Sequence, residues 1–259
     1  MKTDDLEVGK FFMDNKWTTA AKMRCRGAVL NSLLKLGGPF FCLPGESFTD
    51  FFLAWKAGLT PDLVYGCETS KKISQARMSI ARRGEPWRSC VSGRLYNMPA
   101  AKALFWYAIC YLDRPFRVVS LDFCGYLQGG VVDAVNQLFM HKLLAPGGVF
   151  YLTVYAGERG GRDKRRKDLT WFKFSAHRHW RENMLYVANR VQKIAAEHDC
   201  YLEPINAEGP YKGSRSNYRM SLLFNMGWRR VAESAKAASD PVRLPKCWLT
   251  DNEFVRSIT

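Results

Sequence analysis

The stretch FFCLPGESFTDFFLAWKAGLTPDLVYGCE, residues 40–68, contains two strands and the helix that connects them. Residues 40–43 are a short apolar run closed by a Pro-Gly pair, which predicts a buried strand. Residues 48–57 are predicted to form a helix that ends at Gly58, and residues 63–67 a second strand. Both strand runs are continuously apolar, as is typical of parallel strands covered by helices on both faces. The unit therefore predicts an α/β protein with a mostly parallel sheet.

The same alternation continues on both sides of this unit. Further helices are expected at residues 17–36, 70–83, 100–112, 131–144 and 179–198. Further strands are expected at residues 117–121, 149–155, 200–205 and 218–224, with a weak one near 89–91. The last two strands are joined by a short polar loop, so they are predicted to pair as an antiparallel hairpin at the sheet edge.

Composition gives the class of protein and suggests a partner. The 259 residues are 47% apolar and 14% aromatic, which is enough for a sizeable core. The net charge of +15 favours a polyanionic partner, most simply nucleic acid. The N-terminus is polar, no apolar run is long enough to cross a membrane, and the eight cysteines lack the spacing of a zinc site. We therefore expect a soluble cytoplasmic protein with free thiols, no metal site and no membrane contact.

Ligands of parallel sheets bind at the carboxyl ends of the strands, and three such ends carry candidate residues. Gly45 follows the first strand, where a glycine lets a ligand approach the backbone; a plain tight turn is the alternative. Glu68 ends the second strand, where an acid typically accepts hydrogen bonds from ribose hydroxyls; a surface acid that caps the next helix is the alternative. Asp122 and Phe123 follow the strand at 117–121 and form an acid beside an aromatic face, which suits a planar base. An Asp that caps the turn, with the Phe in the core, is the alternative there.

This order of elements resembles the class I S-adenosylmethionine-dependent methyltransferases over roughly residues 20–228. A Pro-Gly-Gly turn at residues 146–148, before the fifth strand, belongs to the same pattern. The tetrapeptide Asp-Phe-Cys-Gly at residues 122–125 is similar to the Asp-Pro-Pro-Tyr and Asp-Pro-Phe-Gly signatures of nucleic-acid amino-methyltransferases. The resemblance implies a Rossmann-like methyltransferase fold with a seven-stranded, mostly parallel sheet. It also implies methyl transfer from S-adenosylmethionine to an exocyclic base amine, such as that of adenine, in DNA or RNA.

The resemblance assigns residues by position. In the family, the acid and the adjoining backbone grip the amine and an aromatic residue stacks on the base. The implied catalytic residues are Asp122, Phe123, Cys124 and Gly125. The implied cofactor contacts are Leu43, Pro44, Gly45, Glu46, Ser47, Glu68, Thr69, Arg94, Leu95 and Asp122. The sequence departs from the family in three places. The glycine turn has one glycine where the family usually has two or three, and no acid follows the third strand. In the fourth-strand motif Phe123 replaces the proline, so the aromatic comes second instead of last.

Two other functions stay open. A non-catalytic nucleic-acid-binding protein that keeps the fold is one of them. The other is a ribose 2′-hydroxyl methylase, a class that uses a Lys-Asp-Lys-Glu tetrad with its second lysine on the fifth strand. Residues 150–155 (FYLTVY) contain no lysine, so methylation of a ribose hydroxyl is less favoured than methylation of a base amine.

A Gly-rich basic run, ERGGRDKRRK at residues 158–167, follows the fifth strand and is a candidate for phosphate contacts. The residues implied are Arg159, Arg162, Lys164, Arg165, Arg166 and Lys167, and a solvated loop is the alternative. We expect three parts along the chain: an N-terminal segment and helix (1–36), the α/β domain (37–228) and a peripheral tail (229–259).

Overall fold

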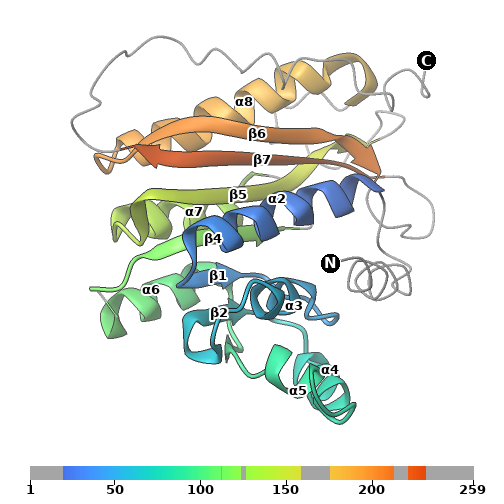
Figure 1. The fold of residues 1–259 in the computed structure, drawn as a ribbon. Coiled ribbons are helices and arrows are strands. Elements are labelled where there is room, and N and C mark those ends of the chain that lie inside the picture. The colour runs from blue at the N-terminus through green and yellow to red at the C-terminus, as the bar shows by residue number, and fades with distance from the viewer. Residues whose placement is uncertain (1–19, 112, 124–126, 159–175, 213–220, 232–259) are drawn as a thin grey trace.

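The computed structural model describes residues 20–111, 113–123, 127–158, 176–212 and 221–231 of the chain. Its strands form one seven-stranded sheet in the order β3-β2-β1-β4-β5-β7-β6 (Figure 1). The strands are β1 Phe40–Cys42, β2 Val64–Cys67, β3 Arg94–Tyr96, β4 Phe116–Asp122, β5 Leu144–Glu158, β6 Tyr201–Lys212 and β7 Ser221–Val231. Strands β1 to β5 pair in parallel, whereas β7 pairs antiparallel with both β5 and β6. The predicted sheet and its antiparallel hairpin are confirmed.

Helices cover both faces of this sheet (Figure 1). They are α2 Ala20–Leu36, α3 Thr49–Lys56, α4 Ile73–Ala81, α5 Trp87–Cys90, α6 Ala100–Cys110, α7 Gly130–Met140 and α8 Ala176–Ala196, with a short 3-10 turn at Pro61–Leu63. One apolar core lies between the sheet and α6, α7 and α8, and a second between the sheet and α2 to α5. Each layer buries the apolar stripe of its helices against the sheet, and this burial stabilises the fold.

The continuous apolar runs are explained by these two cores. Successive side chains of a strand point to opposite faces, so Phe40 packs in the core beneath α2 and α3, while Phe41 packs in the core on the α6 side. Both side chains are fully buried. The ring of Phe41 lies 5.2 Å from that of Phe116 on β4, which joins two neighbouring strands at their amino ends.

The strand predicted near residues 89–91 was wrong. Residues 87–90 form the short helix α5, and β3 begins at Arg94. Cys90 and Val91 are buried, which gives the segment its apolar appearance. Arg77 of α4 donates hydrogen bonds to the carbonyls of Val91 and Gly93, at 2.8 and 2.6 Å, so these groups are not available to a strand ladder.

Further boundaries differ from the expectation; β6, for example, continues to Lys212 and not only to residue 205. The Pro-Gly-Gly segment, expected as a turn before the fifth strand, lies within β5, where the pairing with β4 shifts register between Phe116 and Val118. Strand β7 is longer than expected and continues to Val231. Among the described residues, no helix combines the length and the apolar character needed to cross a membrane.

Candidate active site

A cavity of about 620 Å³ lies at the carboxyl ends of β1, β2 and β4. Strand β1 has β2 on one side and β4 on the other, so the chain's connections run in opposite directions from it. This switch point is where open α/β sheets leave a crevice for ligands. The remaining walls come from α2, the first turn of α3, residues 98–100 at the start of α6, the start of α7, and Tyr155 of β5.

The cavity contains most of the described residues that were predicted to form the site. Those that line it are Leu43, Pro44, Gly45, Ser47, Glu68, Thr69, Asp122 and Phe123. Glu46 is exposed and does not line it. Arg94 and Leu95 do not line it either, because they lie within β3 and not beyond it; Met98, Pro99 and Ala100 take that place on the wall. Cys124, Gly125 and residues 159–167 lie outside the described part of the chain.

The turn between β1 and α3 contains a single glycine, Gly45. Gly45 has a left-handed backbone, with φ of 58°, and a Cβ at this position would meet no atom within 4 Å. A second left-handed residue, Phe48 with φ of 52°, precedes α3. L-residues pay a steric cost there, and the buried ring of Phe48 packs edge-on against Phe51 at 5.5 Å. The chain thus makes this turn with one glycine and Phe48, where the resembled family usually has additional glycines. The space beside Gly45 is open.

Glu68 stabilises the turn after β2 and also lies on the cavity wall. Its Oε1 accepts hydrogen bonds from the backbone amides of Thr69 and Ser70, at 2.8 and 3.2 Å, so it holds the turn that leads to α4. The same residue lines the cavity. The hydroxyl of Ser70 also donates to Glu46, at 2.8 Å, which ties this turn to the glycine turn.

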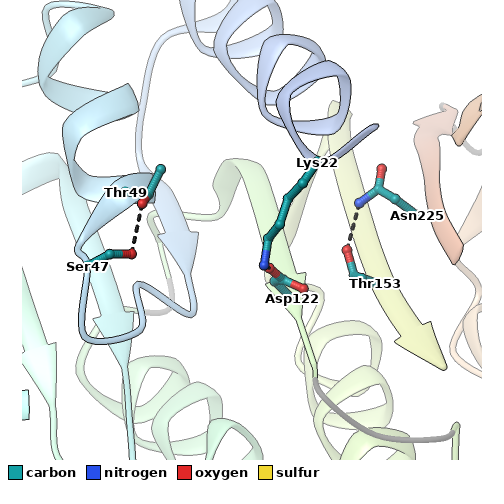
Figure 2. A network of polar contacts seen from close by, with 6 residues as sticks. All are labelled: Lys22, Ser47, Thr49, Asp122, Thr153 and Asn225. Carbon is teal, nitrogen blue, oxygen red and sulfur yellow. Dashed lines mark hydrogen bonds and ion pairs between the residues drawn. The ribbon is translucent and has the colours of Figure 1, made fainter. Parts of the chain in front are cut away.

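Asp122 forms an ion pair with a lysine that is far away in sequence. Lys22 reaches from α2 to Asp122, with 2.9 Å between Nζ and Oδ2, as Figure 2 shows. Both side chains are about a quarter exposed, at 22% and 25%. The other oxygen, Oδ1, is buried and accepts no hydrogen bond from the described residues. A buried oxygen without a donor is destabilising, so the position of Asp122 carries an energetic cost.

A third acid, Asp50, lies in the first turn of α3 and lines the same cavity. Its side chain is buried, with 8% exposed. Burial raises the pKa of Asp50 from 3.8 to about 6; the charge of Arg26 opposes the rise, Asp122 adds to it, and Lys22 opposes it. Two acids and two bases therefore interact at this end of the cavity.

A row of polar side chains continues from Asp122 across the sheet. Asp122 on β4 pairs with Thr153 on β5, and Thr153 pairs with Asn225 on β7. The amide of Asn225 donates to the Thr153 hydroxyl at 2.8 Å, and Figure 2 shows the three side chains next to one another. Thr153 and Asn225 are each only 4% exposed. Buried hydrogen bonds of this kind fix rotamers, so the row gives Asp122 a rigid neighbourhood.

Helix α2 is held over this row by Tyr151. The phenol of Tyr151 donates to the carbonyl of Ala28 at 3.1 Å and also contacts the hydroxyl of Ser32 at 2.9 Å. Both partners lie on α2, so a side chain of β5 sets the position of the helix and of Lys22 along it. The anchoring explains how a lysine near the start of the described chain reaches a strand end 100 residues later.

Sequence reasoning missed Lys22, Arg26 and Asp50. Lys22 and Arg26 are four residues apart on α2, a spacing that puts them on one helix face and that the sequence does contain. Nothing local indicates that this face meets β4. Asp50 follows the glycine turn closely, but an acid in the first turn of a helix is common and does not indicate a site.

Comparison with known proteins supports a fold assignment. No protein-family model and no curated protein matches the sequence. The structure is similar to Trm1 from Pyrococcus horikoshii in complex with S-adenosyl-L-methionine, with a TM-score of 0.53 and 13% identity over 84% of this chain and 57% of that chain. It also matches the methyltransferase domain of the bacterial protein CtHen1-CN, with a TM-score of 0.47 and 11% identity over 81% of this chain and 99% of that one.

Because the identity to Trm1 is low, this likeness shows the fold alone. The strand order, with its antiparallel β7, is consistent with that fold. The chain therefore has the Rossmann-like fold of the class I S-adenosylmethionine-dependent methyltransferases.

Proposed function

We propose that the chain is an S-adenosylmethionine-dependent methyltransferase that modifies nucleic acid at an exocyclic base amine. The observation that carries the proposal is a single cavity with Glu68 at the end of β2 and Asp122 at the end of β4. One acid suits the ribose of a nucleoside cofactor and the other suits the hydrogens of an amine acceptor.

The described residues fit the cofactor. Although the chain carries a net charge of +15, its cavity is lined by three acids and two bases, Asp50, Glu68, Asp122, Lys22 and Arg26. A ligand with a sulfonium and an ammonium group suits this balance. The open space beside Gly45 and the acceptor oxygens of Glu68 would hold the nucleoside part. When bound, S-adenosylmethionine supplies an activated methyl group, so positioning is the main task left to the protein.

Asp122 and Phe123 form the acceptor end in this proposal. An aromatic amine is a poor nucleophile because its lone pair is delocalised into the ring. A carboxylate that accepts its hydrogens favours the nitrogen geometry of the transition state over that of the ground state. Asp122 is fixed for this by Lys22, and the half-buried ring of Phe123 lines the cavity next to it, where a base can stack.

Exposed bases around α4 and α5 make this part of the surface positive, which supports a nucleic-acid partner. Two precede α4, two follow it and one lies on α5: Lys71, Lys72, Arg82, Arg83 and Arg88. Glu85 is the only acid between residues 70 and 92. Lys71 and Lys72 follow Thr69, which lines the cavity, closely in sequence, so phosphates of a bound strand near the site have cations beside them.

This surface gives a salt-dependence prediction. Neutralising Lys71, Lys72, Arg82 and Arg83 together by glutamine should lower the slope of log affinity against log salt by about 3 to 4 units, measured by fluorescence anisotropy with a labelled oligonucleotide. The matched control replaces Lys35, Lys56, Lys102 and Lys142, which lie on other elements. An equal drop in slope in both variants would mean that the loss follows net charge and not this surface.

A ribose 2′-hydroxyl acceptor is the second candidate, because Lys22 provides a lysine beside Asp122. Thr153, and not a lysine, is the register partner of Asp122 on β5, so the tetrad of that class is incomplete there. Incubation with labelled S-adenosylmethionine and matched RNA and DNA oligonucleotides tests both candidates. Transfer to DNA supports a base acceptor, transfer that requires the 2′-hydroxyl supports ribose, and no transfer to either would contradict methyl transfer to nucleic acid.

A further inference from the structure

The outer face of α6 is apolar and exposed. Among the described residues, seven large apolar side chains are exposed, and four of them lie on α6 and at the end of α7. These four are Phe105, Trp106, Ile109 and Met140, with 42%, 43%, 55% and 41% of their surface exposed. The ring of Phe105 lies 5.8 Å from that of His141, which follows Met140 in sequence. The two helices therefore present these side chains on one surface, the α6 patch.

Helix α6 is apolar on both of its faces. Its inner face, with Ala103, Leu104 and Tyr107, is buried in the core against the sheet. Within residues 97–112, only Lys102 is charged. A helix that is apolar all round is typical of one that is covered on both sides. Helix α6 is at the end of the layer formed by α8, α7 and α6 (Figure 1), and its outer face is left in solvent.

The size of the α6 patch is suited to a protein interface. By their exposed fractions, its four large side chains leave on the order of 400 Å² of apolar surface in solvent. A standard interface covers about 800 Å² on each partner, of which about 450 Å² is apolar. The patch therefore supplies nearly the whole apolar part of such an interface.

The charges around the patch suit a second copy of the chain. The net charge of +15 opposes most approaches of two copies, but Lys102, near the amino end, is the only charged residue on α6. Beyond the carboxyl end Asp113 is exposed, and the charges of Arg94 and Arg114 interact with that of Asp62. If two α6 helices pack antiparallel, Lys102 of each copy lies at the carboxyl end of the other helix, where the main-chain carbonyls are partially negative.

We propose that two copies of this chain associate through the α6 patch, with their α6 helices antiparallel about a two-fold axis near Trp106. A two-fold interface uses the same surface of both copies, so Trp106 contacts its own counterpart, and Phe105 and Ile109 pack on either side of it. None of the patch residues lines the cavity. The dimer therefore leaves the cavity open, and the proposal does not depend on the proposed function.

Sedimentation equilibrium of the full chain tests the proposal. The protein is treated with nuclease and kept at about 0.5 M salt, so that bound nucleic acid does not bridge two copies. The wild type should form dimers with a Kd in the micromolar range. Trp106→Lys places two like charges in the contact and should raise the Kd a hundredfold or more, because each dimer contains the change twice. Ile109→Lys should also raise the Kd, and thermal melts show that both variants fold.

The matched controls are Leu34→Lys on α2 and Met78→Lys on α4, which add the same charge at apolar side chains that are 61% and 56% exposed. Both should leave the Kd unchanged. A wild-type chain that stays monomeric at about 100 μM would overturn the proposal, whatever other protein binds to α6. A dimer that both patch variants leave intact would overturn it too, and so would equal losses in patch and control variants, since such losses would follow net charge.

A charge exchange tests the antiparallel arrangement. At about 0.1 M salt, Lys102→Asp and Asp113→Lys should each raise the Kd about threefold to tenfold, because each puts like charges at the same end of the interface. The chain with both changes should return close to the wild-type Kd, because opposite charges then meet again. Losses that add in this double variant would overturn the antiparallel arrangement.

Discussion

The two ends of the cavity are built in different ways. At the β2 end, Glu68 is held by the amides of the next two residues, so its geometry is local. At the β4 end, Asp122 meets Lys22 from a helix 100 residues earlier, and Asp50 and Arg26 join the same group of charges. The first end depends on a turn, whereas the second depends on how α2 packs on the sheet.

We infer from this difference that Glu68 and Asp122 have different functions. A side chain that is fixed by the backbone amides of its sequence neighbours is suited to a ligand that is the same in every turnover, such as a cofactor. A side chain whose partner lies on another element has a position that depends on packing, and that position can suit one particular methyl acceptor. We therefore expect changes at the β4 end to alter transfer, and changes at the β2 end to alter cofactor affinity.

The largest effect is expected for Asp122→Ala. Removing an acceptor that strengthens in the transition state should lower the rate of transfer a hundredfold or more, about 3 kcal/mol. Cofactor affinity should change little. Single-turnover labelling gives the rate, and a thermal melt reports folding. A variant with a lower melting temperature but a wild-type rate per folded molecule would show that Asp122 has only a structural role.

A smaller effect, on stability, is expected for Asp50→Asn. Because the pKa of Asp50 is raised to about 6, the folded state holds this proton more tightly than the unfolded state. The stability from this protonated group is complete below pH 3.8 and is lost as the pH rises through 6. The asparagine variant does not ionise, so it should exceed the wild type by up to about 3 kcal/mol at pH 8 and by little at pH 4. Urea unfolding at both pH values measures this, and a gain of equal size at both would point to packing and not to ionisation.

The sequence was sufficient for what local patterns encode. Continuous apolar runs such as residues 40–43 predicted buried strands, and the two acids expected at strand ends, Glu68 and Asp122, line one cavity. The third strand was misplaced because Cys90 and Val91 are buried for another reason: they belong to the apolar core on the α2 to α5 side, and Arg77 binds the carbonyls of Val91 and Gly93. Lys22 was missed because its partner depends on the crossing of α2 over β4, which no short stretch of sequence encodes.

The smallest effect is expected for Glu68→Ala. Loss of the acceptor for ribose hydroxyls should weaken S-adenosylmethionine by about 2 kcal/mol, roughly thirtyfold. Glu46→Ala is the matched control, because Glu46 accepts a hydrogen bond from Ser70 in the same turn and does not line the cavity. If both variants lose the same affinity, the turn and not the carboxylate of Glu68 matters to the ligand.

The most direct measurement is a calorimetric titration of the wild-type chain and its Glu68→Ala and Asp122→Ala variants with S-adenosylmethionine. We expect one ligand per wild-type chain, roughly thirtyfold weaker binding for Glu68→Ala and a change within about twofold for Asp122→Ala. No binding to the wild-type chain, or a larger loss for Asp122→Ala than for Glu68→Ala, would contradict a cofactor site at the β2 end and an acceptor site at the β4 end.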